Sequence, residues 1–354
     1  MLRFAISSLL SISLSIVAAG CGGPAMWVMS KVIDSNMRTD FAATLPDGLH
    51  ALICGAGGPF ADPERSGPCV AIIAGKTIVV VDSGSGAARN LMRLGLSPGE
   101  VEDVFLTHFH SDHIDGLGEM GTLRWANSGS KTPLPVHGPI GVEEVVDGFN
   151  AAYRQDQAYR NTHHGEAIMP MSGWGLEARA FALPAQGKNV VVFDRDGLVI
   201  RSFAVDHSPV SPAVGYRFDY KGRSIVVSGD TSKSNNLIAQ AKGVDLLIHD
   251  GLSPKLVGLI HESAVKAGNT RLAKIMTDIP GYHASPVDAA ESAQEAGADF
   301  LLFYHVVPPL PISSLEEIYL EGVRKTYEGR VEVAVDGTFI SLPAGSKRIK
   351  AYKR

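Results

Sequence analysis

The sequence predicts an α/β protein in which two mixed β-sheets pack face to face and helices cover their outer faces, an αββα sandwich. Two observations carry this prediction. Strand patterns gather in two blocks, at 50–137 and 190–335, and helical patterns lie between the strands. The chain has 354 residues, 45% of them hydrophobic, which is enough for a sizeable core. Neither a short repeat nor a change of composition divides the chain after residue 45, so we expect one domain over 49–345.

The net charge of the chain is −5 with histidine counted as neutral. A protein whose affinity rests on phosphate-backbone contacts usually carries a basic excess, so the composition predicts no nucleic-acid partner. The hydrophobic fraction also excludes a disordered chain. The composition therefore fits a globular domain.

The first residues resemble a secretory signal. A positive start, Met1-Leu2-Arg3, precedes an apolar run over 4–19 that ends in small residues before Cys21. The run is shorter than the about 20 residues of a bilayer-spanning helix. We expect 1–20 to be a signal peptide, Cys21 to be lipidated as in bacterial lipoproteins, and 21–48 to be a tether. The protein is then periplasmic or held at the membrane by its lipid; an ordinary signal peptide or an uncleaved anchor is the alternative.

The first block of strands is expected at 50–54, 69–74, 77–81, 101–107 and 134–137, with helices at 87–94 and 140–153. Cys54 and Cys69 flank a Gly/Pro-rich turn between two of these strands. In an oxidising periplasm they can bridge adjacent strands as a disulfide. Two buried free thiols are the alternative.

The second block is expected at 190–193, 198–205, 213–220, 224–228, 244–249, 300–304 and 331–335, with helices at 235–241 and 286–296. Ser285 followed by Pro286 is typical of a helix N-cap and the first helical position. Residues 150–188 have low periodicity and many polar positions, so we expect an insertion or lid there. Residues 346–354 are rich in lysine and arginine and are expected to form a solvated basic tail.

The most informative segment is 107–113, Thr-His-Phe-His-Ser-Asp-His, directly after an expected strand. His108 and His110 alternate, so an extended backbone places both rings on one side. Asp112 and His113 follow in the turn and offer an oxygen and a nitrogen. Packing alone does not require three histidines and an aspartate at one strand end. The segment therefore predicts a metal site.

Here the sequence resembles the metallo-β-lactamase fold, whose signature is His-x-His-x-Asp-His after a β-strand. The resemblance runs from about residue 50 to 342, and further ligands of the family match residues in similar contexts. These are His207 before a Gly-Tyr-Arg strand, Asp230 in Ser-Gly-Asp-Thr, and His305 after Phe-Tyr. Asp82, in Val-Val-Asp-Ser-Gly, resembles the family's buried carboxylate behind the metal loop.

The resemblance implies two metal ions. It assigns one ion to His108, His110 and His207 and the other to Asp112, His113 and His305, with Asp230 bridging. Nitrogen and oxygen ligands suit Zn²⁺, with iron or manganese as alternatives. Two such cations can share a hydroxide, which serves as the nucleophile of a hydrolase.

A further histidine indicates which branch of the family the chain resembles. His283, just before the helix expected at 286–296, resembles the extra histidine of the ribonuclease Z and arylsulfatase-like branch. The resemblance implies that it stabilises transition-state charge or protonates the leaving oxygen. Asp250, after His249, stands where this branch carries a glutamate. Asp112 and His283 are the expected catalytic residues, and Asp82 and Asp250 are expected to orient their neighbours.

The substrate expected from these features is a small anionic ester, an aryl sulfate or a phosphodiester. His305 is followed by Val-Val-Pro-Pro rather than by ribonuclease Z's Phe-Ser-x-Arg-Tyr run, and a Gly- and Lys-rich arm for tRNA is not evident. An export signal also separates the protein from tRNA. Arg154, Arg160, His163 and His164 in the expected insertion can bind such an anion, or they are solvated loop residues.

Several other functions stay open from the sequence. A ribonuclease Z-like endonuclease for the 3′ end of tRNA requires residues 1–20 not to be an export signal. A lactonase-type hydrolase is a further enzyme, and a non-catalytic metal-binding lipoprotein is the option without catalysis. The oligomeric state is open, a homodimer included.

Overall fold

The structure is a computed structural model that describes residues 22–38 and 41–354. The chain divides into two compact units, Met1–Phe41 and Ala42–Arg354. The expected signal peptide and Cys21 lie outside the described residues.

The first unit contributes one described helix, α2 (Gly22–Arg38). The expected tether at 21–48 is therefore helical over much of its length, since Ala, Met and Lys favour a helix. Apolar side chains of α2 are exposed, among them Met26, Trp27 and Val28. Among the described residues, no helix is long and apolar enough to cross a membrane.

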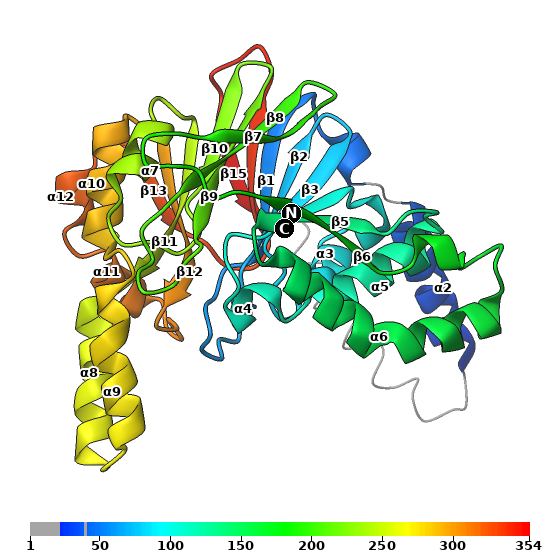
Figure 1. Cartoon of the computed structure of the whole chain (residues 1–354), viewed down its shortest axis with the longest axis horizontal. Coiled ribbons are helices and arrows are strands. Elements are labelled where there is room, and N and C mark those ends of the chain that lie inside the picture. The colour runs from blue at the N-terminus through cyan, green and yellow to red at the C-terminus, as the bar shows by residue number, and fades with distance from the viewer. Residues whose placement is uncertain (1–21, 39–40) are drawn as a thin grey trace. The chain divides into compact units, whose positions relative to one another are not determined.

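The second unit contains the two expected sheets (Figure 1). The first is 8-stranded, in the order β15-β14-β1-β2-β3-β4-β5-β6. Its strands are β1 (Gly48–Gly55), β2 (Cys69–Ala74), β3 (Thr77–Val81), β4 (Asp103–Phe105), β5 (Leu134–Pro139), β6 (Leu176–Phe181), β14 (Thr338–Pro343) and β15 (Lys350–Lys353). Strands β3 to β6 pair in parallel and the others antiparallel, so the sheet is mixed.

The second sheet is 7-stranded, in the order β13-β12-β11-β10-β9-β8-β7. Its strands are β7 (Val190–Arg195), β8 (Leu198–Ala204), β9 (Val214–Tyr220), β10 (Arg223–Val227), β11 (Leu246–Leu252), β12 (Phe300–Val307) and β13 (Arg330–Val333). Strands β10 to β13 pair in parallel. Their carboxyl ends therefore lie at one edge of the sheet, where the predicted ligands follow.

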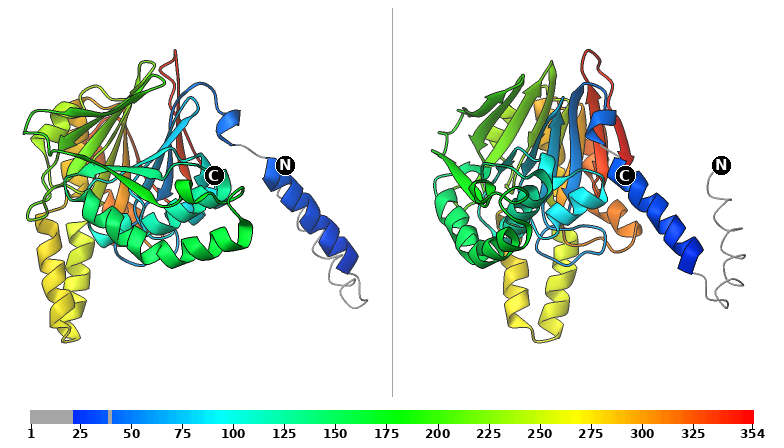
Figure 2. Two further views of the ribbon diagram at one scale, coloured as in Figure 1. Left: turned by 45° about the vertical axis from the view of Figure 1, so that its right-hand side comes forward. Right: turned by 90° about the vertical axis from the view of Figure 1, so that its right-hand side faces the viewer.

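The main core fills the space between the two sheets (Figure 2). Alternate residues of β1, Leu49 and Ile53 among them, meet Ile225 and Val227 of β10 in one cluster of side chains with 0% exposure. Because side chains alternate along a strand, the residues between them face the outer helices. The predicted αββα sandwich is confirmed.

Helices cover the outer faces of both sheets. On the first sheet these are α3 (Ala87–Arg93), α5 (Leu117–Ser128) and α6 (Val142–His164), and on the second α7 (Asn235–Gln240) and α10 (Pro286–Ala296). The short helices α11 (Ser314–Tyr319) and α12 (Val323–Thr326) pack on α8 (Pro254–Lys266) and α10 respectively. The helix α4 (Ser111–Ile114) lies in the metal loop. Ser285 caps α10 as predicted, accepting a hydrogen bond from the Asp288 backbone N–H.

A helical hairpin that the sequence analysis missed projects away from the sheets (Figures 1 and 2). It consists of α8 (Pro254–Lys266) and α9 (Thr270–Asp278), which pack against each other. Ser253 and Asn269 cap the two helices with their side-chain oxygens. Val257 and Met276 are buried at its base, so packing as well as capping fixes the hairpin.

Two segments differ from expectation. Residues 150–188 are no single insertion, because α6 continues to His164 and β6 joins the first sheet as its edge strand. The half-exposed pattern of β6 explains why its periodicity is weak. The expected basic tail is also partly wrong, because residues 350–353 form β15 along β14. Lysines are common on such edge strands, where their charge opposes pairing with other chains.

Candidate metal centre

The predicted ligands meet where several strands of the two sheets end. His108 and His110 follow β4, and Asp112 and His113 lie in α4 directly after them. His207 follows β8, Asp230 follows β10, and His305 lies in the last part of β12. The fold thereby brings together residues far apart in the sequence, such as Asp112 and His305, which are 193 positions apart.

Asp230 lies at the centre of this cluster. Its Oδ2 is 3.3 Å from Nε2 of His113 and 3.4 Å from Nε2 of His305. The same oxygen is 3.8 Å from Nε2 of His108 and 3.9 Å from Nε2 of His207. One carboxylate oxygen thus faces both groups of predicted ligands, which fits the predicted position of Asp230 between them.

The donor set fits two divalent cations. Ligand atoms of His108, His110, His207 and Asp230 lie within 4.8 Å of one another, and so do those of Asp112, His113 and His305. Tetrahedral ligands at about 2.0–2.2 Å from a zinc ion are about 3.3–3.6 Å apart, close to the contacts around Asp230.

His113 Nε2 and Asp230 Oδ1 are among the buried atoms of the cluster that have no hydrogen-bond partner within the part of the chain that the structure describes. Buried polar atoms without a partner are costly, and a cation at this position removes the cost. The arrangement therefore matches a dinuclear site, while nitrogen and oxygen donors alone do not distinguish zinc from iron or manganese.

Burial and charge set the protonation of the ligands. Burial lowers the pKa of His108 well below its usual value, and it also lowers the pKa of His110 and of His207. Neutral imidazole is the form that ligates a metal. Burial opposes protonation of His113 and His305 too, but the facing carboxylate of Asp230 raises the pKa of both rings. A bound cation competes with these protons.

Asp82 orients the metal loop from behind. Its carboxylate accepts hydrogen bonds from the Thr107 backbone N–H at 2.8 Å and the Thr107 hydroxyl at 2.9 Å. His113 Nδ1 lies 2.8 Å from the same carboxylate. With its hydrogen on Nδ1, the neutral His113 ring has a lone pair on Nε2, the nitrogen that faces Asp230. Asp82 also has a left-handed backbone with φ 56°, a strained conformation that often marks a functional position.

A bulge directs His305 into the cluster. On β11, Asp250 alone lies between the pairs His249–Phe303 and Gly251–Val306, whereas β12 has two residues there, Tyr304 and His305. The extra residue re-aims the side chain. His305 adopts φ 45°, so its backbone is strained in the same way as that of Asp82.

His283 and Asp250 form a pair beside the predicted ligands. His283 Nδ1 lies 3.0 Å from Oδ2 of Asp250, and His249 Nδ1 lies 3.0 Å from Oδ1. Burial raises the pKa of Asp250, but hydrogen bonds from His249 and His283 outweigh it and lower the pKa, so the carboxylate stays ionised. The shorter aspartate therefore reaches His283. A ring nitrogen of His283 also lies within 4.8 Å of ligand atoms of Asp230 and His305.

A cavity of about 120 Å³ opens beside these residues. Its polar wall includes His110, Asp112, Asp230, His283 and His305, and its other wall is apolar, with Pro59, Phe60, Leu252, Ile275, Ile279, Tyr282 and Val307. The sequence analysis missed the apolar wall. Its residues come from separate segments, and apolar side chains carry no motif that reveals a shared cavity.

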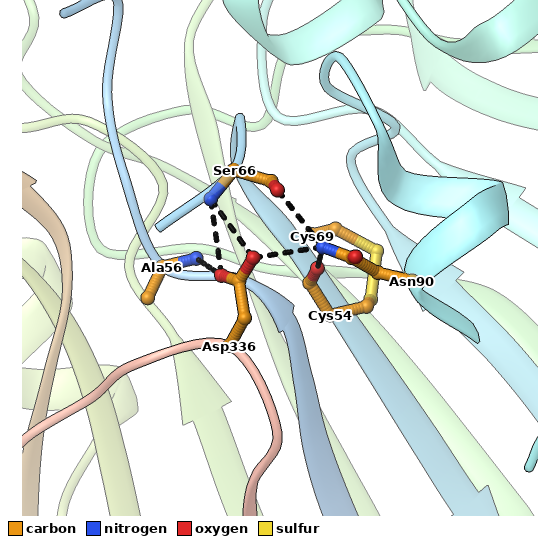
Figure 3. Close-up of a disulfide and its surroundings, with 6 residues drawn as sticks. All are labelled: Cys54, Ala56, Ser66, Cys69, Asn90 and Asp336. Carbon is orange, nitrogen blue, oxygen red and sulfur yellow. Dashed lines mark hydrogen bonds between the residues drawn. A yellow bond between two sulfur atoms is a disulfide. The ribbon is translucent and has the colours of Figure 1, made fainter. Parts of the chain in front are cut away.

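The loop that carries Pro59 and Phe60 starts and ends at a disulfide. Cys54 and Cys69 are bonded between β1 and β2, with 5.0 Å between their Cα atoms (Figure 3). Of the two alternatives left open by the sequence, the structure has the bridge. The disulfide closes a covalent ring around the whole loop.

Asp336 fixes the same loop from the turn between β13 and β14 (Figure 3). Its carboxylate accepts hydrogen bonds from the backbone N–H of Ala56 at 3.0 Å and of Ser66 at 3.0 Å, and from Asn90 Nδ2 at 2.8 Å. The disulfide and these hydrogen bonds therefore hold the loop in one conformation.

The four residues expected to bind an anion lie elsewhere, on the second half of α6. This helix has 23 residues, a length of about 34 Å, and only its start adjoins Phe109 of the metal loop. Arg160 donates to Asp156, and His163 and His164 are exposed in the last turn. Of these two histidines, Arg154 and Arg160, all described by the structure, none lines the cavity. The helix thus places these side chains outside the cavity, and their role in binding an anion stays a prediction.

A sequence profile described as the metallo-beta-lactamase superfamily matches residues 62–305. The chain belongs to the metallo-beta-lactamase superfamily. A relative from Mycobacterium avium (strain 104), named ribonuclease Z, is 32% identical over 300 residues, which are 84% of this chain and 100% of the relative. A relative of the same name from Mycobacterium bovis (strain BCG / Pasteur 1173P2) is 34% identical over 81% of this chain and 96% of its own length. Within the superfamily the chain thus falls in the ribonuclease Z-like branch, as the residues around His283 predicted.

Solved structures agree with this fold. Human tRNase Z, short form, superposes with a TM-score of 0.60 at 21% identity, covering 83% of this chain and 99% of the human chain. The protein is therefore a metallo-beta-lactamase superfamily hydrolase. The expectation that nucleic acid plays no part conflicts with relatives named for a ribonuclease, and these relatives give a sulfate ester no support.

Proposed function

We propose that this protein is a metal-dependent phosphodiesterase of the ribonuclease Z type, which cleaves a phosphodiester bond of RNA. The observation that carries the proposal is the His283–Asp250 pair on the cavity beside the ligand cluster. Relatives at 32–34% identity are named ribonuclease Z, and they favour a phosphodiester over the aryl sulfate expected from the sequence.

The proposed site divides the work between its residues. His108, His110 and His207 would hold one ion and Asp112, His113 and His305 the other, with Asp230 between them. Bound there, the two ions would polarise the phosphate and lower the pKa of a water molecule for attack. Asp112, whose side chain is 15% exposed, and the more exposed His110 are the ligands that the polar wall of the cavity presents to solvent.

His283 is placed to serve the leaving group. Its Nδ1 hydrogen is held by the ionised Asp250, so Nε2 is the atom that can carry a proton toward the cavity. As the P–O bond breaks, this proton passes to the leaving oxygen, which departs as an alcohol. Asp250 compensates the positive charge of the protonated ring before the transfer, and His249 Nδ1 lies 2.9 Å from the Asp250 backbone carbonyl oxygen and 3.0 Å from its Oδ1.

A small phosphodiester outside the cytoplasm is the second candidate substrate, and one observation favours it. The Cys54–Cys69 bridge is typical of proteins that fold in an oxidising compartment and is rare in the bacterial cytosol. It supports the proposal that the protein is exported by its first 20 residues and held at the membrane by Cys21. An exported enzyme does not meet precursor tRNA in the cytoplasm.

A substrate panel tests both candidates. Zinc-loaded full-length protein is incubated with a precursor tRNA carrying a 3′ extension, with bis(p-nitrophenyl) phosphate and with p-nitrophenyl sulfate. Cleavage of the precursor at the end of the acceptor stem supports the first candidate, and turnover of the small phosphodiester alone supports the second. Turnover of the sulfate ester alone contradicts both.

A further inference from the structure

We propose that the apolar wall of the cavity is a subsite for one planar aromatic group, such as a nucleobase, attached to the phosphate at the metal centre. This inference rests on the proposed function and names the part of the substrate that the fold selects. It is carried by the juxtaposition of Phe60, Ile275, Ile279 and Tyr282 with the predicted ligands around one cavity.

The wall is assembled from two structures that meet over the ligands. Leu252, Val257, Met276, Ile279 and Val307 form a buried cluster at the base of the α8–α9 hairpin, and Phe60 and Tyr282 pack against it. Phe60 belongs to the loop that the disulfide closes, and Ile275 and Ile279 come from the hairpin and its end. The subsite therefore exists only because the loop and the hairpin contact each other.

Both parts of the wall are rigidly tied to the metal centre. The backbone of Gly58 is so close to His305 that a Cβ atom there would lie 3.0 Å from the ring. On the hairpin side, the Tyr282 carbonyl oxygen accepts a hydrogen bond at 2.9 Å from Nδ1 of His207. Each half of the subsite thus adjoins a predicted ligand, so a group bound there is directly beside the reacting phosphate.

The size and chemistry of the cavity point to a single ring. The cavity is small, about 120 Å³, so we expect it to hold one ring rather than several stacked bases. Apart from the predicted ligands and His283, its walls offer aromatic and branched aliphatic side chains, the ring of Pro59 and one hydroxyl, that of Tyr282. Aromatic side chains stack on bases of any sequence, so such a subsite recognises a flat face rather than a base identity.

Equilibrium binding of two phosphate monoesters tests the subsite separately from catalysis. The zinc-loaded full chain is titrated with phenyl phosphate and with methyl phosphate by calorimetry. Both carry the same dianion, and they differ in the ring alone. We expect phenyl phosphate to bind about tenfold more tightly, because part of the ring leaves water. Equal affinities, or no binding of phenyl phosphate, would overturn the inference.

Matched variants locate the effect. Ile275→Ala and Phe60→Ala should each reduce the preference for phenyl phosphate to about threefold or less without changing the affinity for methyl phosphate. Leu259→Ala is the control, because Leu259 lies on the same hairpin at 55% exposure, close to the 51% of Ile275, and does not line the cavity. If Leu259→Ala lowers the preference as much as Ile275→Ala, the wall is not the subsite.

The two proposals can fail separately. Selective binding of phenyl phosphate by a protein that cleaves no phosphodiester contradicts the proposed function and leaves the subsite intact. Cleavage of phosphodiesters with no preference between the two monoesters contradicts the subsite alone.

Discussion

Replacing Asp82 by asparagine changes one oxygen behind the metal loop into an N–H donor. Three donors converge on the native carboxylate: the Thr107 backbone N–H on Oδ1, and the Thr107 hydroxyl and His113 Nδ1 on Oδ2. Asparagine tolerates the left-handed backbone at this position, so the substitution tests the hydrogen bonds and not the chain path.

Either orientation of the new amide disrupts one of these hydrogen bonds. With its nitrogen in the place of Oδ2, the amide forces Nδ1 of His113 to accept, which moves the imidazole hydrogen to Nε2 and removes the lone pair that faces Asp230. With its nitrogen in the place of Oδ1, the amide faces the Thr107 backbone N–H at about the native 2.8 Å. One charge-assisted hydrogen bond, about 1.5–3 kcal/mol, is lost in either case.

At 1.36 kcal/mol per factor of ten, that loss corresponds to about 10–150-fold weaker binding of the metal ligated by His113. Competition with a chelator of known zinc affinity measures it, and circular dichroism verifies that the variant is folded. Asp245→Asn is the control, since Asp245 is also buried and accepts from the Ser224 backbone N–H at 2.8 Å in another part of the fold. Wild-type zinc affinity for both ions in folded Asp82→Asn, or an equal loss in Asp245→Asn, would refute the reasoning.

Three further predictions concern catalysis, stability and location. His283→Ala should keep its zinc and lose about 10²–10⁴-fold in turnover, with a larger loss for an alkoxide than for a nitrophenolate leaving group, as steady-state kinetics and metal analysis can show. The double variant Cys54→Ala/Cys69→Ala should lose about 2–4 kcal/mol of unfolding free energy in urea titrations, because the unfolded chain is no longer constrained. Full-length protein should fractionate with the cell envelope of its native host, and Cys21→Ser should release it.

Each of these has an opposing outcome. Loss of zinc from His283→Ala would make this residue a ligand, in line with its position near Asp230 and His305. If His283→Ala slowed the hydrolysis of every ester equally, His283 would only shape the cavity and would not protonate the leaving group. Two titratable thiols in the native protein would contradict the disulfide, and an unprocessed cytosolic chain would contradict export and favour tRNA as substrate.

The ligand types of the candidate metal centre could be predicted from the sequence because several of the ligands lie together in one short segment. His108, His110, Asp112 and His113 follow one strand, and alternation along the backbone places rings on one side without any tertiary contact. The sandwich could be predicted for a similar reason, since hydrophobic periodicity within each strand reports which faces are buried. His283 was identifiable because its resemblance to a known branch lies beside a helix start that Ser285 and Pro286 mark.

The tertiary structure decided what depends on distances between segments. Only the packing of the strand ends places Oδ2 of Asp230 within 3.3–3.9 Å of four imidazole nitrogens. Likewise, Phe60 and Ile275 form one wall only because a disulfide-closed loop lies against a helical hairpin. Arg160 shows the converse, since its charge suggested a role at the site, whereas the direction of α6 places it outside the cavity. Residues that are neighbours in the sequence determine local geometry, such as the side of a strand on which two rings lie. The meeting of distant segments at one site depends on the order of strands in the sheets and on the directions of the helices, which no single segment encodes.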